Sequence, residues 1–268
     1  MKKFLLSLLC ISVASTLIFT SCAKKKVVDT KEDTKKDTIV QEIIVPEIPF
    51  EYGSNMDGTG AVIYAYTGHD KDVVIPSEVM DPNTGDMLAV TELGENLFFS
   101  NIEVQSIVVP EGVTKVGPGC FQNCKNLVSV SLPSTLEEIG ARAFVASDAI
   151  TDMQIPASVK NIGLMAFSSL SYSLPWLDTL SGNPVIVGDG ILLSYKGSGN
   201  VTFGPEVKHV AYYAFANSAV KSVTFSSALE SIDSNAFVGC DAKISLADNC
   251  PAIDTVKGID YETYTPAQ

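Results

Sequence analysis

Residues 107–144 read IVVPEGVTKVGPGCFQNCKNLVSVSLPSTLEEIGARAF, and this stretch decides the fold because it contains one pattern twice. In each copy a short β-type segment ends in proline, a Val or Leu follows, then a Val or Ile with Gly, and then Phe. The two phenylalanines, Phe121 and Phe144, lie 23 residues apart. Self-similarity at a period of this size predicts a repeat architecture, in which each repeat is one structural unit stacked on the next.

The same pattern occurs on both sides of this stretch. Aligned on its last aromatic residue, it recurs at Phe98, Phe121, Phe144, Phe167, Phe215 and Phe237. These positions are 23, 23, 23, 48 and 22 residues apart, so the long step is one repeat plus an insertion, at about residues 171–200. No single turn can bury its apolar residues alone, so such arrays need several repeats and capped ends. We expect the phenylalanines of successive turns to line up as one continuous internal column.

The β-type segments predict how the turns pair. Each is too short to be stable by itself, so it should pair with the equivalent segment of the next turn and give a parallel sheet along a coil. Side chains of a strand alternate between its two faces. Val130 and Leu132 should therefore point inward, and Ser129 and Ser131 outward. The proline that follows most of these segments ends the strand, because it lacks a backbone donor.

The registered copies resemble the BspA-type leucine-rich repeat family, whose units run near 23 residues from a strand ending in Pro to an IG-xx-AF motif. Residues 139–144 and 162–167 match this motif, whereas Ala211 and Asp233 replace its Gly. The resemblance covers residues 72–240. It implies an α/β to mostly β fold, a right-handed leucine-rich repeat solenoid or horseshoe with short parallel strands on its concave face. It also implies surface display and a role in adhesion or protein binding.

The rest of the chain forms the ends of the solenoid and the insertion. Residues 47–71 contain the turn signal NMDGTG followed by alternating apolar residues, which predicts an N-terminal β-hairpin that caps the first coil. The leucine-rich repeats span residues 72–240, and residues 241–268 should cap the other end. Within the insertion, Asp189 and Gly190 suit a tight turn. We expect a hairpin there that either stands off the coil or widens its sheet.

The N-terminus has the features of an exported protein. Residues 1–21 combine a basic start with an apolar stretch too short for a comfortable membrane span, which is typical of a signal peptide. Residues 19–22, FTSC, resemble a bacterial lipobox, in which the thiol of Cys22 would be acylated. The alternative is an ordinary signal peptide that leaves Cys22 as a free thiol. Residues 22–46 are rich in charged residues, which predicts a flexible, lipid-anchored tether. We expect a membrane-anchored lipoprotein at the cell surface or in the periplasm.

Four further cysteines follow Cys22. Cys120 directly precedes a repeat Phe and Cys124 lies three residues after it, positions that suit small buried thiols. Export makes a disulfide chemically possible, and Cys240 with Cys250 is the favoured pair, although sequence does not fix connectivity. We expect no metal site, because no histidine accompanies the cysteines at ligand spacing.

Composition limits the classes of function. The chain of 268 residues has 18 Lys or Arg and 31 Asp or Glu, a net charge of −13, which argues against nucleic acid as a partner. Its two histidines and the absence of a phosphate loop, nucleophile elbow or zinc motif give no enzyme signature. The segment 81–86 is interpreted as an insertion turn rather than a calcium loop. We expect a monomer with no catalytic residue and no cofactor.

The outward strand positions form the candidate binding strip. Its members are Asp72, Val74, Ser106, Val108, Ser129, Ser131, Asp152, Gln154, Asn200, Thr202, Ser222 and Thr224. Such a strip can accept a flat protein or glycan surface through many modest hydrogen bonds, unless its small residues merely face water. In the insertion, Tyr172 and Trp176 are a second candidate as exposed aromatic anchors, unless Trp176 packs against the coil.

These observations predict a noncatalytic leucine-rich repeat module that binds a protein or glycan surface. One rival hypothesis is a structural envelope protein without a dedicated ligand. A weaker rival is a hydrolase that uses carboxylates around the insertion. Close, inward-facing acids in a cleft would favour the hydrolase.

Overall fold

The computed structural model describes residues 24–26, 43–45, 48–168, 175–256 and 258–266. The chain divides into two compact units, Met1–Ile48 and Pro49–Gln268. In the first unit, β1 (Lys24–Lys26) pairs antiparallel with β2 (Ile43–Val45). The predicted signal peptide and the predicted acylation site at Cys22 lie outside the described residues.

The second unit begins with a β-hairpin that caps the coil, as expected. Strands β3 (Phe50–Ser54) and β4 (Ala61–Tyr66) pair antiparallel across the predicted turn, and β4 continues in parallel with β7 (Met87–Leu93). A second hairpin joins β6 (Glu78–Met80) to β7. Its connection is the 81–86 segment, where the backbone amide of Gly85 donates to the carbonyl of Asp81. That bond confirms the insertion-turn interpretation.

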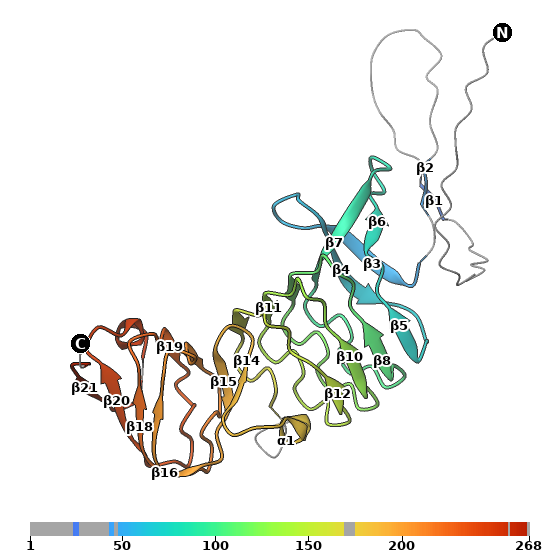
Figure 1. Ribbon diagram of the computed structural model, residues 1–268. Coiled ribbons are helices and arrows are strands. Elements are labelled where there is room, and N and C mark those ends of the chain that lie inside the picture. The colour runs from blue at the N-terminus through green and yellow to red at the C-terminus, as the bar shows by residue number, and fades with distance from the viewer. Residues whose placement is uncertain (1–23, 27–42, 46–47, 169–174, 257, 267–268) are drawn as a thin grey trace, which may run out of the picture. The chain divides into compact units, whose positions relative to one another are not determined.

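Each regular turn contributes two short strands, and these build two parallel sheets (Figure 1). The first strands are β5 (Asp72–Val74), β8 (Ser106–Val108), β10 (Ser129–Ser131) and β12 (Asp152–Met153), and they form the predicted sheet. As expected, Val130 is buried and Leu132 half-buried, while Ser131 is exposed and Ser129 half-buried. Alternation along a strand therefore defines which side chains reach the core.

The second strands were not predicted. They are β9 (Lys115–Val116), β11 (Glu138–Ile139) and β13 (Asn161–Ile162), which extend the sheet of β3, β4 and β7 in parallel. Each has only two residues, so its sequence shows no alternating run. Gly117 and Gly140 follow β9 and β11, and a Cβ on Gly140 would lie 2.6 Å from the backbone of Gly117. The motif glycine is therefore needed because successive turns approach closely at this corner.

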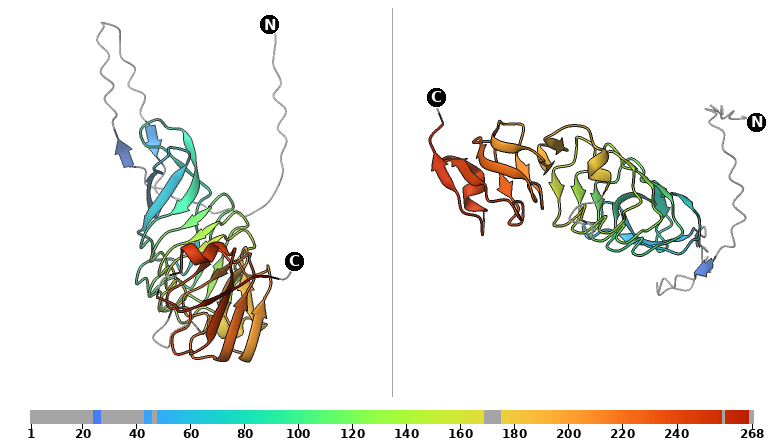
Figure 2. Two further views of the ribbon diagram at one scale, coloured as in Figure 1. Left: turned by 90° about the vertical axis from the view of Figure 1, so that its left-hand side faces the viewer. Right: turned by 90° about the horizontal axis from the view of Figure 1, so that it is seen from below.

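The insertion divides the coil into two stacks, which Figure 2 shows in order along the chain. After α1 (Trp176–Thr179), strands β14 (Val185–Val187) and β15 (Ile191–Ser194) form the predicted hairpin. Strand β15 pairs in parallel with β17 (His209–Val210), which pairs with β19 (Ser231–Ile232). Of the two expected placements, the hairpin therefore takes the one that widens a sheet. We call residues 49–168 together with α1 the N-terminal stack, and residues 185–266 the C-terminal stack.

The C-terminal stack has its own sheet of first strands. This sheet contains β16 (Ser198–Phe203), β18 (Ala219–Phe225), β20 (Lys243–Ala247) and β21 (Glu262–Tyr264), all parallel. A short 3-10 helix, η1 (Pro251–Asp254), lies between the last two strands in sequence. Residues 241–266 thus continue the sheet and close the end of the solenoid.

The aromatic core follows the repeat but not as one column. In the N-terminal stack the rings of Phe98, Phe121, Phe144, Phe167 and Trp176 follow one another with centroids 5.0–5.7 Å apart. In the C-terminal stack Tyr195, Phe215 and Phe237 form a second series, at 5.6 and 4.5 Å. The predicted continuous column is therefore two columns. The break falls at the insertion. The first series ends at Trp176, and the second begins at Tyr195.

Candidate binding surface

The structure aligns the candidate binding strip of the N-terminal stack in rows across the parallel strands. Asp72, Ser106, Ser129 and Asp152 are register partners and form one row. The hydroxyl of Ser106 donates to the carboxylate of Asp72 at 2.6 Å. Equivalent side chains of successive turns therefore lie beside one another on this face.

A second row is less polar. It contains Val74, Val108 and Ser131, and the two valines are 70% and 43% exposed. Gln154 follows β12 and is also exposed. We call these eight residues the N-terminal strip. Its small hydroxyls, two carboxylates and exposed valines form a surface that mixes polar and apolar atoms.

The other four members of the strip lie on the C-terminal stack. Asn200 aligns with Ser222, and Thr202 with Thr224, in the sheet of β16 and β18. The rows continue to residues that sequence reasoning assigned only to the cap: Lys243 beside Ser222, Ser245 beside Thr224, and Glu262 beside Ser245. The alternation of Ile244, Ser245 and Leu246 was the signal that could have placed them.

The structure does not join the two halves of the strip in one sheet. Strand β12 ends one sheet and β16 begins another, and the insertion lies between them in sequence. The twelve predicted residues therefore form two separate polar surfaces rather than one continuous band.

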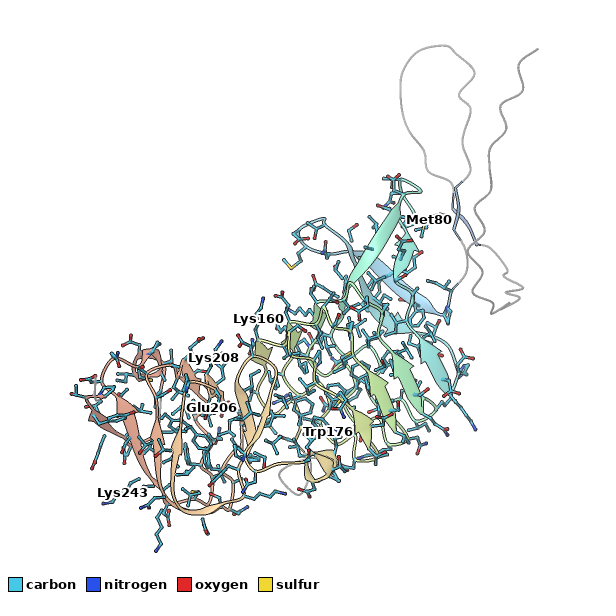
Figure 3. The ribbon with its side chains drawn as sticks, viewed as in Figure 1. Met80, Lys160, Trp176, Glu206, Lys208 and Lys243 are labelled. Atoms are coloured by element: carbon cyan, nitrogen blue, oxygen red, sulfur yellow. The ribbon has the colours of Figure 1, made fainter. Side chains whose placement is uncertain are left out.

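Trp176 does not provide an exposed anchor, so that prediction is wrong and the packed alternative holds. Its side chain is 1% exposed, and its ring lies 5.2 Å from that of Phe167. The indole Nε1 donates to the carbonyl of Met153 in β12 at 3.0 Å (Figure 3). An indole has an apolar body and one donor, and both are satisfied here inside the fold. Tyr172, the other residue of this candidate, lies outside the described residues.

The favoured disulfide between Cys240 and Cys250 is not formed, and both thiols are free. The two sulfurs have different partners. The thiol of Cys250 donates to the carbonyl of Leu229 at 3.0 Å, while Cys240 accepts a hydrogen bond from the hydroxyl of Ser218 at 3.2 Å. Burial raises the pKa of Cys250, which keeps this thiol protonated.

Cys120 and Cys124 are buried free thiols, as the sequence predicts. Burial raises the pKa of Cys124 to about 12 and raises that of Cys120 as well. Cys124 donates to the carbonyl of Phe98 at 3.0 Å, and one turn later the hydroxyl of Ser147 donates to the carbonyl of Phe121 at 2.5 Å. The slot three residues after the Phe is thus filled by small donors that satisfy a buried carbonyl of the preceding turn.

The face of the second strands differs from the strip in its charge. Lys115 pairs with Glu138 at 3.5 Å, and Lys160 with Glu137 at 2.9 Å. Lys208 donates to Asp189 at 2.7 Å, a hydrogen bond that lowers the pKa of Asp189; Figure 3 labels both Lys160 and Lys208. Carboxylates on this face are therefore paired with lysines at the surface. Exposed pairs of this kind contribute little to stability.

The junction between the stacks is hollowed in several places. In a regular turn four residues separate the second-strand Val or Ile from the Phe, as between Val210 and Phe215. In the inserted turn only two residues separate Leu192, the register partner of Val210, from Tyr195. A hollow of about 130 Å³ lies beside this short connection, between Phe167 and Tyr195. A larger groove of about 460 Å³ lies between the fourth turn and β14.

The repeat and its register are matched by one family of known proteins. A family model described as "BspA type Leucine rich repeat region (6 copies)" matches residues 89–174 and 183–255, more than half of the chain. The chain belongs to the BspA-type leucine-rich repeat family. The gap in the match, residues 175–182, falls within the insertion and contains α1.

Several solved structures are similar to this BspA-type chain. A leucine-rich repeat protein of T. pallidum is 20% identical over 82% of this chain and 97% of its own, with a TM-score of 0.46. A leucine-rich repeat protein of Bacteroides capillosus is 29% identical over 42% of this chain and 83% of its own, with a TM-score of 0.40. A leucine rich cell surface protein of Faecalibacterium prausnitzii is 17% identical over 83% and 94%, with a TM-score of 0.36. No curated protein matches the sequence.

The described ranges of this BspA-type module contain neither a membrane-spanning helix nor a metal-binding cluster. Within those ranges no helix combines the length and the apolar character needed to cross a membrane. Nor do three or more His, Cys, Asp or Glu side chains from the same ranges gather in a group that could hold a metal ion.

Proposed function

We propose that this protein is an exported bacterial lipoprotein whose repeat module is a noncatalytic binding device for a protein or glycan surface. The export signals of residues 1–21, the lipobox-like FTSC and the charged tether support an envelope or surface location. Membership of the BspA-type family supports a role in binding. Acylated Cys22 would hold the module at the membrane, and the strip would face its partner.

One observation carries this proposal: outward side chains of successive turns are in register on an open parallel sheet. The rows of the N-terminal strip run across four strands with no other element of the described residues paired over that face. A rigid row of hydroxyls and carboxylates can make several hydrogen bonds to one flat partner without reorganising. The exposed Val74 in the last strand and Val108 in the strand beside it add apolar area to the strip.

A binding role also fits the chemistry of the strip better than a reaction does. Its polar groups are Ser, Asp and Gln, and no histidine lies among them to act as the base of a nucleophilic hydroxyl. The one close polar pair, Ser106 with Asp72, is exposed. The pKa of a hydroxyl falls only in a buried or charged environment, so exposure gives the hydroxyl of Ser106 no such activation. Hydrogen-bond recognition is the use that these groups support.

The experiment is a binding array of extracellular matrix proteins, glycans and envelope components, probed with the mature chain. Ser131→Arg places a long charged side chain in the second row of the strip and should weaken binding by about tenfold or more, because it prevents flat contact. Ser234→Arg makes the same change at an exposed turn outside the strip and should leave binding unchanged. Equal binding by both variants would contradict the assignment to the strip, and no ligand in any class would favour a structural envelope protein.

A further inference from the structure

The larger groove at the junction is a second candidate binding site that lies apart from the strip. Its volume of about 460 Å³ falls within the range of about 300–1,000 Å³ that is usual for ligand pockets. The fourth turn contributes Ile155 and Ala157, α1 contributes Trp176, and the inserted hairpin contributes β14. In a regular repeat the next turn would fill this space, so the groove exists because the insertion displaces that turn.

The groove has no charged residue in its lining, although the chain has 18 Lys or Arg and 31 Asp or Glu. Its walls are Ile155, Leu180, Val185 and Val187, and its polar side chains are the amide of Gln154, the hydroxyl of Ser181 and the indole. A charged ligand group would lose its hydration here without gaining a partner of opposite charge. An occupant must therefore present uncharged, mainly apolar side chains.

One wall of the groove is the outer edge of β14, which ends where the backbone amide of Asp189 donates to the carbonyl of Val159 in the fourth turn at 2.7 Å. Strand β14 is the last strand of its sheet and, among the described residues, pairs only with β15. The opposite wall follows β12, which ends the other sheet. The outward carbonyl of Met153 in β12 is already used by Trp176. An edge strand presents a row of backbone donors and acceptors, which an extended backbone can satisfy.

We propose that this groove binds an uncharged, apolar peptide segment of a protein partner in extended conformation, which adds as a strand to the outer edge of β14. Backbone hydrogen bonds to residues 185–187 would hold the segment, and alternate side chains would enter the groove, as in other cases of strand addition. This activity goes beyond the proposed function, because the strip recognises a flat surface and the groove an extended chain. Gln154, at the rim, is the one residue that both sites share.

The test uses the fluorescence of Trp176, which is the only tryptophan of the chain and lines the groove. The probe is a seven-residue peptide of alternating Val and Thr with acetylated and amidated ends, titrated into the mature chain. Its matched control has the same side chains but N-methyl groups on alternate residues, which remove the donors of one edge. We expect a saturable emission change with the first peptide and about tenfold or more weaker binding of the second, because two or more hydrogen bonds are lost. Equal affinity of the two peptides, or no binding, would overturn the proposal.

Two substitutions locate the site. Val187→Lys puts a charge into the groove and should abolish the emission change, whereas Val74→Lys makes the same substitution on the strip and should leave it intact. If Val187→Lys unfolds, Gln154→Lys tests the exposed rim with less risk to the core. Peptide binding that survives Ser131→Arg separates this site from the strip. The chain could also self-associate in the absence of peptide. If Val187→Lys removed that self-association, a second copy of the chain would be the occupant, which would contradict the proposal.

Discussion

At the scale of single residues, each described repeat holds a left-handed backbone at one or two positions. These positions lie two residues before and two residues after the repeat Phe. The residues with positive φ there are Asn96, Gly119, Arg142, Met165 and Tyr213 before it, and Ser100, Asn123, Ala146, Asn217 and Gly239 after it. The left-handed region costs an ordinary side chain about 1–2 kcal/mol, whereas Gly adopts it freely and Asn tolerates it. This conformation could not be predicted for Arg142 or Ala146 from their residue types. Only the glycines at the equivalent positions, Gly119 and Gly239, are typical of it.

Ala146→Gly should therefore stabilise the protein. Ala146 has a φ of 58°, a backbone angle that Gly adopts without the steric cost that a Cβ atom brings. We expect a gain of about 1 kcal/mol, or a rise in Tm of about 2–4 °C, in thermal unfolding followed by circular dichroism. Ala141→Gly is the matched control: its φ is negative, so the same substitution should lower Tm. Equal shifts for both variants would show that the left-handed turn at Ala146 is not strained.

At the scale of elements, each stack ends with an aromatic donor on a backbone carbonyl of its first-strand sheet. Trp176 donates to Met153 in β12, and the hydroxyl of Tyr264 donates to Phe225 in β18 at 2.9 Å. Met153 lies in the last strand of its sheet, where a buried carbonyl without a partner costs about 1–3 kcal/mol, so the indole donor makes it possible for the N-terminal stack to end. The sequence predicted an insertion here but left open whether its Trp is exposed or packed, since composition does not distinguish an aromatic anchor from an internal cap.

Trp176→Phe tests this cap. Phenylalanine keeps the ring beside Phe167 but removes the donor to Met153, so we expect a loss of about 1–3 kcal/mol in urea unfolding. Because repeats interact mainly with their neighbours, amide exchange should accelerate in the fourth turn and remain slow in β20. Tyr264→Phe is the counterpart at the other end and should accelerate exchange only in the C-terminal stack. A uniform effect of Trp176→Phe on both stacks would mean that they unfold as one unit and that the cap is not local.

At the scale of the whole molecule, the period of the repeat predicted far more of the fold than any single residue did. The 23-residue step of the Phe predicted the coil, the parallel first strands and the outward strip, because every copy repeats the same local requirement. The second strands escaped prediction since two residues such as Glu138 and Ile139 contain no period. The break between the stacks was not predicted for another reason. The two-residue connection from Leu192 to Tyr195 can be recognised as short only once Leu192 is known to pair with Val210. Local departures from a repeat are where tertiary pairing, rather than pattern, determines the structure.

The anchor is the property of the whole molecule that remains a prediction, and Cys22→Ala tests it. If the thiol of Cys22 is acylated after removal of residues 1–21, this variant should leave the detergent phase and appear as a soluble product when cells are extracted with a phase-separating detergent. A single acyl chain gives only marginal membrane binding, so stable partitioning needs more than one chain on the modified N-terminal cysteine. Cys124→Ala is the control, because its thiol is buried within the repeats, and it should partition as the unmodified protein does. A Cys22→Ala product that still enters the detergent phase would show that something other than acylation holds the protein at the membrane.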